Sequence, residues 1–320
     1  MGFDDIVGHG KQKELLLSTL TSGRLPHAFL FTGQEGIGKK RTAREFAKYI
    51  LCDEHSACGT CRPCMKVDRG THPDVLIIEN DDSIGIDQSR SISKEVFEYP
   101  YEGDRRVILI DGADRMTHEA TNALLKTLEE PPPFNVFLLI TSSERDVPLT
   151  IRSRCAKISF TPLSRENVKQ YFRKEAGMDE EKAELLSRIS EGSIGCGFFW
   201  SEKENFLLRR RIAEMVLGKK RGFLQVTALA ERITNSPGEL MMYLSFLLSL
   251  FRDVSTVTEY GETGLVVNRD VKDLLEGQSA DVKWIEMSIA KIRETFRILR
   301  YNINKLLAVE NLFLHITEHV

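Results

Sequence analysis

Short apolar runs alternate with amphipathic segments along the first half of the chain. Runs of consecutive apolar residues that are rich in β-branched and aromatic side chains are typical of buried strands. They predict strands over Ala28–Phe31, Asp74–Ile78, Arg106–Ile110, Val136–Thr141 and Lys157–Phe160. Apolar residues at helical spacing predict helices up to Leu20, from Arg41 onward, over Ile92–Phe97 and over Thr117–Glu130. This alternation predicts an α/β domain with a parallel sheet and helices on both faces.

Strand signals nearly stop after Pro162, and helical spacing takes over. The expected helices are Arg165–Ala176, Glu180–Ser190, Phe206–Leu217, Leu224–Ile233, Gly238–Phe251, Val282–Leu299 and Leu306–His315. A break is expected over residues 192–195, where two glycines and a serine interrupt the pattern. We therefore expect three parts: an α/β domain over 1–161, a small helical domain over 162–220 and an all-α domain over 221–320.

Composition and charge narrow the class of protein. The net charge is −3, from 44 basic and 47 acidic residues, so bulk electrostatics give no reason to expect tight nucleic-acid binding. The longest apolar run, Leu240–Phe251, is interrupted by Ser245 and Ser249 and is too short to span a bilayer, which favours a buried helix. The N-terminal residues show no apolar signal core. We expect a soluble protein of the cytoplasm.

Four of the six cysteines lie close together, at Cys52, Cys58, Cys61 and Cys64. Their C-x5-C-x2-C-x2-C spacing allows the four thiolates to surround one tetrahedral zinc ion, and four protein ligands leave no open position for catalysis. The sequence thus predicts a structural zinc knuckle over residues 52–64, the alternative being four free thiols in a loop. His55 and His72 are expected at the surface.

The segment between the first strand and its helix has the G-x-x-x-x-G-K pattern of a phosphate-binding loop. Gly33, Gly36 and Gly38 allow backbone N–H groups to turn toward an anion, and Lys39 adds a positive charge. The next position in such loops is a serine or threonine whose hydroxyl binds magnesium. Here it is Lys40. The loop can still bind phosphate, but its magnesium ligand is lost.

The acidic residues at the end of the third strand are altered as well. Asp111 lies where a metal-facing aspartate is expected, but the following position, where a glutamate would orient the attacking water, is Gly112. Two losses in the same reaction predict that nucleotide binding is weak or absent and that hydrolysis is very slow. The alternative is an ordinary ATPase with altered motifs.

Ser153-Arg154-Cys155 follows the fourth strand. Taken alone, such an arginine is more often structural than catalytic. Its planar and permanent positive charge is also what stabilises a transferring phosphoryl group when a neighbouring subunit supplies it in trans. An altered site of its own combined with an intact arginine suggests a subunit that serves another subunit's ATP.

These motifs, in this order, resemble the clamp-loader branch of the AAA+ family, and within it the delta-prime subunits of bacterial DNA polymerase III. The resemblance is carried by residues 27–43, the cysteine knuckle, 107–117, 122–132, 153–155 and 302–314. It spans nearly the whole chain. The knuckle together with LLKTLEEPP and Ser-Arg-Cys is highly specific to this branch.

The resemblance implies an AAA+ domain over 1–161 with an inserted zinc knuckle, a helical lid over 162–220 and a helical collar over 221–320 that builds a ring. It also implies a subunit that does not hydrolyse ATP and presents Arg154 to the ATP site of an adjacent motor subunit. The implied partners are gamma/tau-type motor subunits, a delta subunit, the sliding clamp, and primed DNA through the assembled complex. No membrane partner is implied.

Two alternatives remain at this point. The first is a catalytically active gamma/tau-type ATPase subunit, which shares the knuckle and the Ser-Arg-Cys motif. Active relatives carry a nucleotide-sensing arginine after a Gly-Ser pair in the lid, whereas Gly192-Ser193 is followed here by Ile194, Gly195 and Cys196. The second is a DNA-binding protein that uses the zinc knuckle. That knuckle has one basic residue, Arg62, and no aromatic side chain for stacking on a base.

Overall fold

The structure is a computed structural model that describes residues 2–79, 84–85, 95–218, 223–235, 237–261, 264–276, 280–299, 301 and 303–318. The chain divides into two compact units. The first contains Met1–Tyr171 together with Gly192–Gly195, and the second contains Phe172–Glu191 together with Cys196–Val320.

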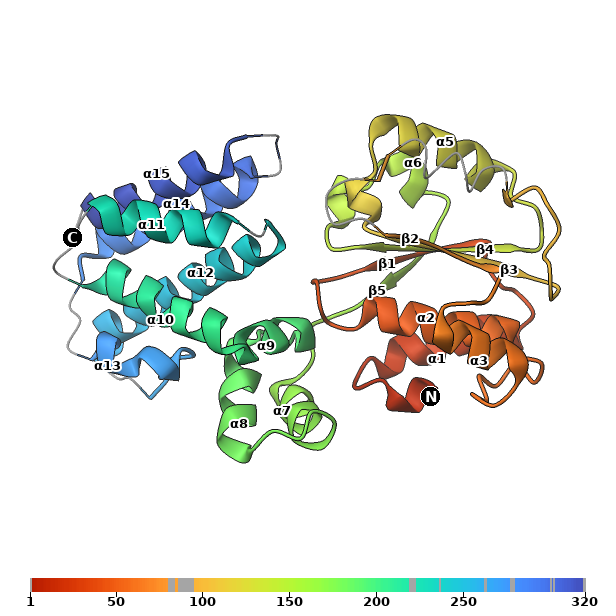
Figure 1. Cartoon of the computed structure of the whole chain (residues 1–320), viewed down its shortest axis with the longest axis horizontal. Helices are drawn as coiled ribbons and strands as arrows, with labels where there is room; N and C mark the ends of the chain where they lie inside the picture. The colour runs from red at the N-terminus through yellow and green to blue at the C-terminus, as the bar shows by residue number, and fades with distance from the viewer. Residues whose placement is uncertain are drawn as a thin grey trace. The chain divides into compact units, whose positions relative to one another are not determined.

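The first unit is built on a five-stranded sheet in which every pair of neighbouring strands is parallel (Figure 1). The strand order is β2-β3-β4-β1-β5. The strands are β1 (Ala28–Thr32), β2 (Val75–Glu79), β3 (Arg106–Asp111), β4 (Asn135–Thr141) and β5 (Ala156–Ser159). Because parallel strands end at the same edge, the residues that follow β1, β2, β3 and β4 meet along one side of the sheet.

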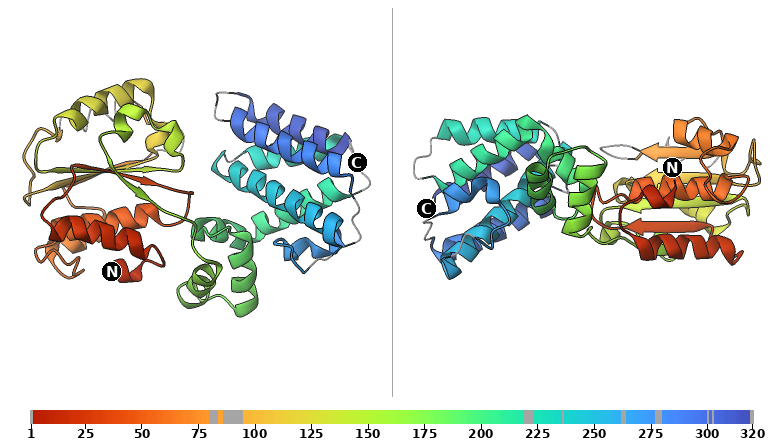
Figure 2. Two further views of the ribbon diagram at one scale, coloured as in Figure 1. Left: turned by 180° about the vertical axis from the view of Figure 1, so that it is seen from behind. Right: turned by 90° about the horizontal axis from the view of Figure 1, so that it is seen from below.

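Helices cover both faces of this sheet (Figures 1 and 2). One face carries α1 (Gly10–Thr21), α2 (Lys39–Leu51) and α3 (Arg62–Arg69), and the other carries α5 (His118–Glu129) and α6 (Leu149–Arg152). The unit also contains the short 3-10 turns η1 (Phe3–Asp5), η2 (Ala113–Arg115) and η3 (Glu144–Asp146).

Side-chain alternation along the strands divides the core into two layers. Phe29 and Phe31 of β1 point to the face where Phe46 of α2 packs, with the Phe29 and Phe46 ring centroids 5.4 Å apart. Leu30 points to the opposite face and packs in a second cluster with Leu124 of α5. The central strands are therefore buried on both faces, which explains why their sequences are continuous apolar runs and not alternating ones.

Helices alone follow β5 in the described residues. They are α7 (Arg165–Lys174), α8 (Glu180–Ile189), α9 (Ile194–Ser201), α10 (Lys203–Leu217), α11 (Phe223–Thr234), α12 (Pro237–Tyr260), η4 (Arg269–Val271), α13 (Lys272–Leu275), α14 (Val282–Ile298) and α15 (Lys305–Glu318). Within the second unit α12 packs against α14, and α11 packs against α15.

The long helix α12 has the length and apolar composition of a membrane span over Glu239–Tyr260. However, 61% of its most apolar window is buried inside the protein. Leu244, Leu247 and Phe251 have no exposed surface. This is the pattern of a core helix, as expected from the sequence.

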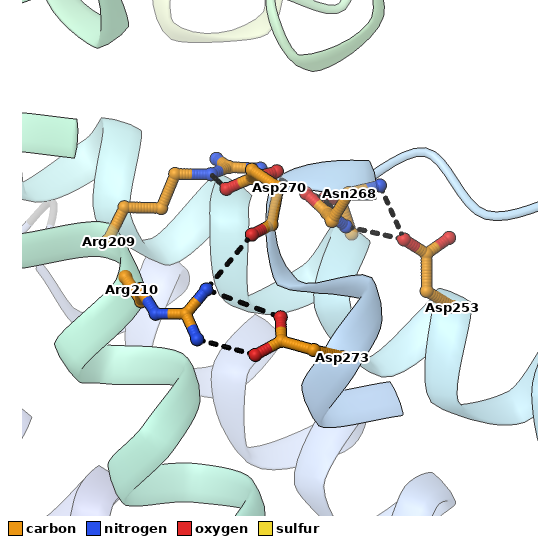
Figure 3. Close-up of polar contacts among 7 residues, drawn as sticks. Arg209, Arg210, Asp253, Asn268, Asp270 and Asp273 are labelled. Carbon is orange, nitrogen blue, oxygen red and sulfur yellow. Dashed lines mark hydrogen bonds and ion pairs between the residues drawn. The ribbon is translucent and has the colours of Figure 1, made fainter. Parts of the chain in front are cut away.

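A buried polar cluster links three segments of the second unit (Figure 3). Arg209 of α10 is 1% exposed and forms an ion pair of 2.9 Å with Asp270. Its guanidinium carbon lies 3.9 Å from the centroid of the Phe246 ring. Asn268 donates hydrogen bonds to Asp253 of α12 through both its backbone N–H, at 2.8 Å, and its side-chain amide, at 2.7 Å. The connection before α13 is thereby fixed to α10 and α12.

The predicted α/β class with a parallel sheet followed by helices is confirmed, and all five predicted strands are present within one or two residues of their expected ends. Half of the predicted helix Ile92–Phe97, residues 92–94, lies outside the described residues. The expected break after α8 is shorter than predicted, since α9 already begins at Ile194. The division of the helical part into 162–220 and 221–320 stays a prediction.

Candidate functional site

The phosphate-type loop connects β1 to α2, and its three glycines are required by their positive φ angles, with close packing as a second reason at Gly33 and Gly36. Gly33 has φ 146°, and a Cβ added there would lie 2.5 Å from the carbonyl oxygen of Phe160. Gly36 has φ 74°, and a Cβ would lie 2.4 Å from Oγ of Ser193. Gly38, with φ 104°, is the N-cap of α2. The loop thus has the backbone form that the sequence predicts, with a helix N-terminus behind it.

The loop lysine is turned back onto its own loop. Lys39 is 6% exposed, and its Nζ donates hydrogen bonds to the carbonyl oxygens of Gly33 at 2.5 Å and Gln34 at 2.6 Å. Burial lowers the pKa of Lys39, against the opposing effect of carboxylates that include Glu35 and Asp111. The ammonium is therefore already satisfied by backbone oxygens.

Lys40 bridges the carboxylates at the ends of two neighbouring strands. Its Nζ forms an ion pair with Glu79 at the end of β2 and another, at 3.3 Å, with Oδ2 of Asp111 at the end of β3. The strand register pairs Glu79 directly with Asp111, so both carboxylates face the same region. Partial burial disfavours the charged lysine, but the hydrogen bond to Glu79 and the charges of both carboxylates outweigh it and raise the pKa of Lys40.

The remaining acidic group after β3 is also engaged. Gly112 has φ 92°, and a Cβ there would lie 2.4 Å from Nε of Arg115, so a glutamate at this position would require rearrangement. Asp114 accepts hydrogen bonds from Oγ1 of Thr141 at 2.7 Å and Oγ of Ser142 at 3.1 Å. No carboxylate in this part of the described structure occupies the position of a water-orienting base.

Residues 192–195, which belong to the same compact unit as the sheet, contact the loop directly. The hydroxyl of Ser193 donates to the carbonyl oxygen of Glu35 at 2.9 Å, and the N–H of Gly195 donates to that of Gly36 at 3.0 Å. Sequence reasoning missed these contacts and the Lys40 bridge. A signal existed only for the bridge, because a lysine at the magnesium position and carboxylates at two adjacent strand ends are visible in the sequence.

The four predicted cysteine ligands come together beside the C-terminus of α2 and the start of α3. Their sulfur atoms all lie within 4.8 Å of one another, and Cys52 and Cys64 are buried. The Sγ of Cys52 lies 3.7 Å from that of Cys58 and 3.8 Å from that of Cys61. Four sulfurs at Zn–S distances of about 2.3 Å in a tetrahedron would be about 3.8 Å apart. The cluster therefore fits a tetrahedral metal ion with four thiolate ligands.

The electrostatics of the cysteine cluster favour thiolate at two positions, Cys52 and Cys58, since hydrogen bonds from Thr60 and Cys61 also lower the pKa of Cys58. Burial opposes ionisation of Cys52, but hydrogen bonds from backbone groups that include Cys58 and Ser56 lower its pKa to about 6. Burial raises the pKa of Cys64, to which its cysteine neighbours contribute. His72 was expected at the surface, and this is wrong. It is 6% exposed, and its Nδ1 accepts a hydrogen bond from the backbone N–H of Asp74.

Arg154 follows α6 and has a partly exposed side chain, 33% accessible. Its Nη2 forms an ion pair of 2.7 Å with Glu129, and its Nη1 donates to the carbonyl oxygen of Thr150 at 2.8 Å. Among the described residues, no contact joins it to Lys39 or Asp111. The structure therefore brings together the loop, Lys40 and Asp111 in one cluster and leaves Arg154 at a separate surface position.

Comparison with known proteins gives consistent results. Residues 8–164 match the profile of a family described as "DNA polymerase III, delta subunit". The chain is 31% identical over 298 residues to the DNA polymerase III subunit delta-prime of Pseudomonas aeruginosa, which covers 89% of this chain and 90% of that protein. It is 30% identical over 253 residues to the DNA polymerase III subunit tau of Salmonella typhimurium. That match covers 76% of this chain but only 39% of the tau subunit.

Among solved structures, the fold is similar to that of a DNA polymerase III gamma subunit-related protein from Thermotoga maritima. The TM-score is 0.52 at 20% identity, and the match covers 96% of this chain and 99% of that one. At this identity the likeness concerns the fold alone.

Proposed function

The chain belongs to the family of DNA polymerase III delta-prime subunits, and we propose that it is the non-hydrolysing subunit of a clamp-loader complex. In this proposal it supplies Arg154 in trans to the ATP site of a neighbouring ATPase subunit. The complex opens the sliding clamp and loads it on primed DNA during replication. Such a role places the protein in the bacterial cytoplasm.

The observation that carries the proposal is the position of the Lys40 ammonium. A P-loop ATPase needs a divalent cation between the loop hydroxyl, the strand-end aspartate and the nucleotide phosphates. Here Lys40 replaces the hydroxyl and itself contacts Asp111. A magnesium ion brought to Asp111 would meet a positive charge that two carboxylates already stabilise, so the site disfavours the ion that ATP hydrolysis requires.

The loop contacts support weak or absent nucleotide binding. A phosphate group cradled by Gly33, Gly36 and Gly38 would have to draw the Lys39 ammonium away from the two carbonyl oxygens that accept its hydrogen bonds. The phosphate would also lie close to the hydrogen bonds that Ser193 and Gly195 donate to carbonyl oxygens of the loop. Any ATP or ADP that binds would therefore compete with existing internal contacts.

Arg154, in contrast, is accessible to a partner. A guanidinium presented from outside stabilises negative charge that grows on the transferring phosphoryl group, and in other systems this contributes roughly 10³–10⁵ in rate. An exposed arginine held by surface contacts meets the steric requirement for this role. The gamma/tau-type alternative requires turnover in cis, whereas the delta-prime proposal requires Arg154 only.

The partners in this proposal are gamma/tau-type motor subunits and a delta subunit, with the sliding clamp and primed DNA reached through the assembled complex. We further propose that residues 162–220 act as the lid and 221–320 as the collar through which the chain joins the ring. The helix packing of α11 with α15 and of α12 with α14 supports a compact helical collar, against which α10 also packs through α12 and α13.

The four cysteines would hold one structural zinc ion. The donor set is entirely sulfur, the spacing of the sulfur atoms fits a tetrahedral ion, and all ligands come from one short segment. Such an ion would bind the α2–α3 connection together and take no part in phosphoryl transfer.

The proposal is tested by measuring ATP hydrolysis by the purified chain alone and by the complex reconstituted with its motor subunits. We expect background turnover for the chain alone. We expect the complex to hydrolyse ATP with a rate that falls when this subunit carries Arg154→Ala. A steady rate by the chain alone that Lys39→Ala abolishes would overturn the proposal in favour of a gamma/tau-type ATPase.

A further inference from the structure

The side chain of Arg154 is held at the surface by an ion pair and a hydrogen bond. Its Nη2 lies 2.7 Å from Oε1 of Glu129, and its Nη1 lies 2.8 Å from the carbonyl oxygen of Thr150. Both terminal nitrogens, Nη1 and Nη2, therefore already donate to partners. An arginine carries five N–H donors, so several remain for a group that approaches from outside.

The two partners come from rigid elements. Glu129 is the last residue of α5, and Thr150 lies in α6, the short helix that precedes Arg154. Both helices pack against each other on the same face of the sheet (Figure 1). Leu128 and Ile151, the neighbours of Glu129 and Thr150 in sequence, are buried in the core on that face. The backbone positions of both contacts are thus fixed by core packing.

The ion pair is of little use for folding. The side chain of Glu129 is 50% exposed and that of Arg154 is 33% exposed. Exposed ion pairs of this kind contribute little to stability. An unrestrained arginine side chain, however, loses rotamer entropy when it is placed in one geometry. A contact that already holds the arginine in this geometry before phosphoryl transfer lowers the entropy that must be lost on reaching the transition state.

We infer that Glu129 is a positioning residue for Arg154. It holds the guanidinium in the orientation from which the neighbouring subunit's ATP site receives it, and Thr150 fixes the second point of the same plane. This inference rests on the proposed trans role of Arg154. It assigns a function to the first glutamate of the Glu129-Glu130 pair, which α5 presents at its C-terminal end.

The test uses the complete complex, reconstituted with its motor subunits, clamp and primed DNA. This subunit is supplied as the unmodified chain, as Glu129→Gln, as Arg154→Ala and as the double variant. Glu130→Gln is the matched control, since Glu130 makes no ion pair with Arg154 in the described part of the chain. The readouts are kcat and KM for stimulated ATP hydrolysis and the rate of clamp loading.

Glu129→Gln is expected to lower kcat and the loading rate about 2- to 5-fold, the effect of losing one exposed charge contact. KM for ATP should stay unchanged, because Glu129 does not bind the nucleotide. The double variant should match Arg154→Ala, since a positioning residue has no effect once its target is gone. Glu130→Gln should behave as the unmodified chain.

Three results would overturn the inference, and they are distinguishable. If Arg154→Ala leaves both rates unchanged, the trans role fails and Glu129 has nothing to position. If Arg154→Ala slows the complex but Glu129→Gln does not, or speeds it, the proposed function stands and the positioning role is wrong. If Glu129→Gln slows the Arg154→Ala complex further, Glu129 acts on its own and not through the arginine.

Discussion

At the scale of single residues, the replacement of a hydroxyl by the Lys40 ammonium changes the electrostatics of the whole loop. A serine or threonine would complete a divalent metal site together with Asp111. The lysine instead brings a positive charge that Glu79 and Asp111 neutralise internally. The site therefore pairs its own carboxylates internally, and in the proposed function this residue is the main reason why the chain does not hydrolyse ATP.

Lys40→Thr should therefore restore magnesium-dependent nucleotide binding. The change removes the competing charge, adds a hydroxyl ligand and leaves two carboxylates facing the loop. We expect the Kd for ATP with Mg²⁺ to tighten at least about tenfold, which corresponds to ~1.4 kcal/mol. Hydrolysis should stay at background, because Gly112 still provides no base. Calorimetric titration with and without Mg²⁺ measures the effect.

Lys203→Thr makes the same change of charge and side chain at the exposed start of α10 and serves as the control. If Lys40→Thr binds nucleotide no better than this control, the loop is inert for another reason. The Lys39 contacts with the Gly33 and Gln34 carbonyls would then be the next explanation to consider.

A buried histidine makes the first unit sensitive to acid. His9 is 8% exposed, and its Nε2 lies 2.8 Å from the carbonyl oxygen of the loop residue Ile37. Burial lowers the pKa of His9, and the charges of Lys13 and Lys39 act in the same direction, against the hydrogen bond to Ile37, which raises it. Below pH ~6.5 the unfolded chain binds a proton here that the folded chain resists, so the free energy of unfolding falls as the pH falls.

His9→Gln should remove part of that decline. Denaturant unfolding at about pH 7.5 and about pH 5.5 should show a smaller loss of stability for the variant, by at most about 1.4 kcal/mol per pH unit for one proton. Burial also lowers the pKa of His72, so the stability of the variant should still fall somewhat as the pH falls. An unchanged slope in His9→Gln would mean that this side chain is protonated equally in both states.

The residue-scale features differ in how far the sequence predicts them. The identity of Lys40, Gly112 and the four cysteines already predicts that hydrolysis is lost and that the cysteines bind a metal ion. The partners of Lys40 and Arg154 do not follow from the pattern, because Glu79 and Glu129 lie far from them in sequence and meet them only through the register of β2 with β3 and the packing of α5 on α6.

At the scale of elements, the sequence predicts most accurately the strands whose residues are buried one after another. The runs that form β1, β3 and β4 are buried over nearly their full length, and their positions were predictable. Helix α3 was missed because it starts between two cysteines with a proline in its first turn. Helix α12 extends well past its predicted end because tertiary burial of Val254 and Val257 continues its apolar face.

The knuckle between α2 and α3 should depend on its metal. Metal analysis of protein purified without chelator should return one zinc ion per chain, and Cys61→Ser should lose it and lower the melting temperature. Cys196→Ala changes a cysteine of the other unit and should keep the ion. Chelation at neutral pH should reproduce the Cys61→Ser melting curve. Protein that contains no zinc and melts as before would show that the cluster is four free thiols.

Two adjacent arginines of α10 provide a matched pair for the helical unit (Figure 3). Arg209 is buried and paired with Asp270, whereas Arg210 is exposed and paired with Asp273. Removing one partner of a buried ion pair leaves an uncompensated charge, which costs about 3–5 kcal/mol. Arg209→Met should therefore destabilise the helical unit strongly, and Arg210→Met should leave its unfolding midpoint unchanged. Equal midpoints for both variants would contradict a structural role of the buried cluster.

At the scale of the whole molecule, the chain combines a nucleotide-type α/β unit with a helical unit. Its own loop cluster is closed by Lys40, Ser193 and Gly195, while the Arg154 guanidinium remains at the surface. The sequence predicted the class of the fold and the order of its parts. It could not predict how the helical part divides, because every helix there has the same periodic signal and boundaries depend on packing between helices.

The central claim is that this subunit serves another subunit's ATP and not its own. The most direct test compares Lys39→Ala with Arg154→Ala, each in this subunit alone, within the reconstituted complex. We predict that Arg154→Ala lowers clamp- and DNA-stimulated ATP hydrolysis partially and clamp loading more strongly, with assembly intact. Lys39→Ala should leave both rates unchanged. The opposite pattern, a loss with Lys39→Ala and none with Arg154→Ala, would contradict the account.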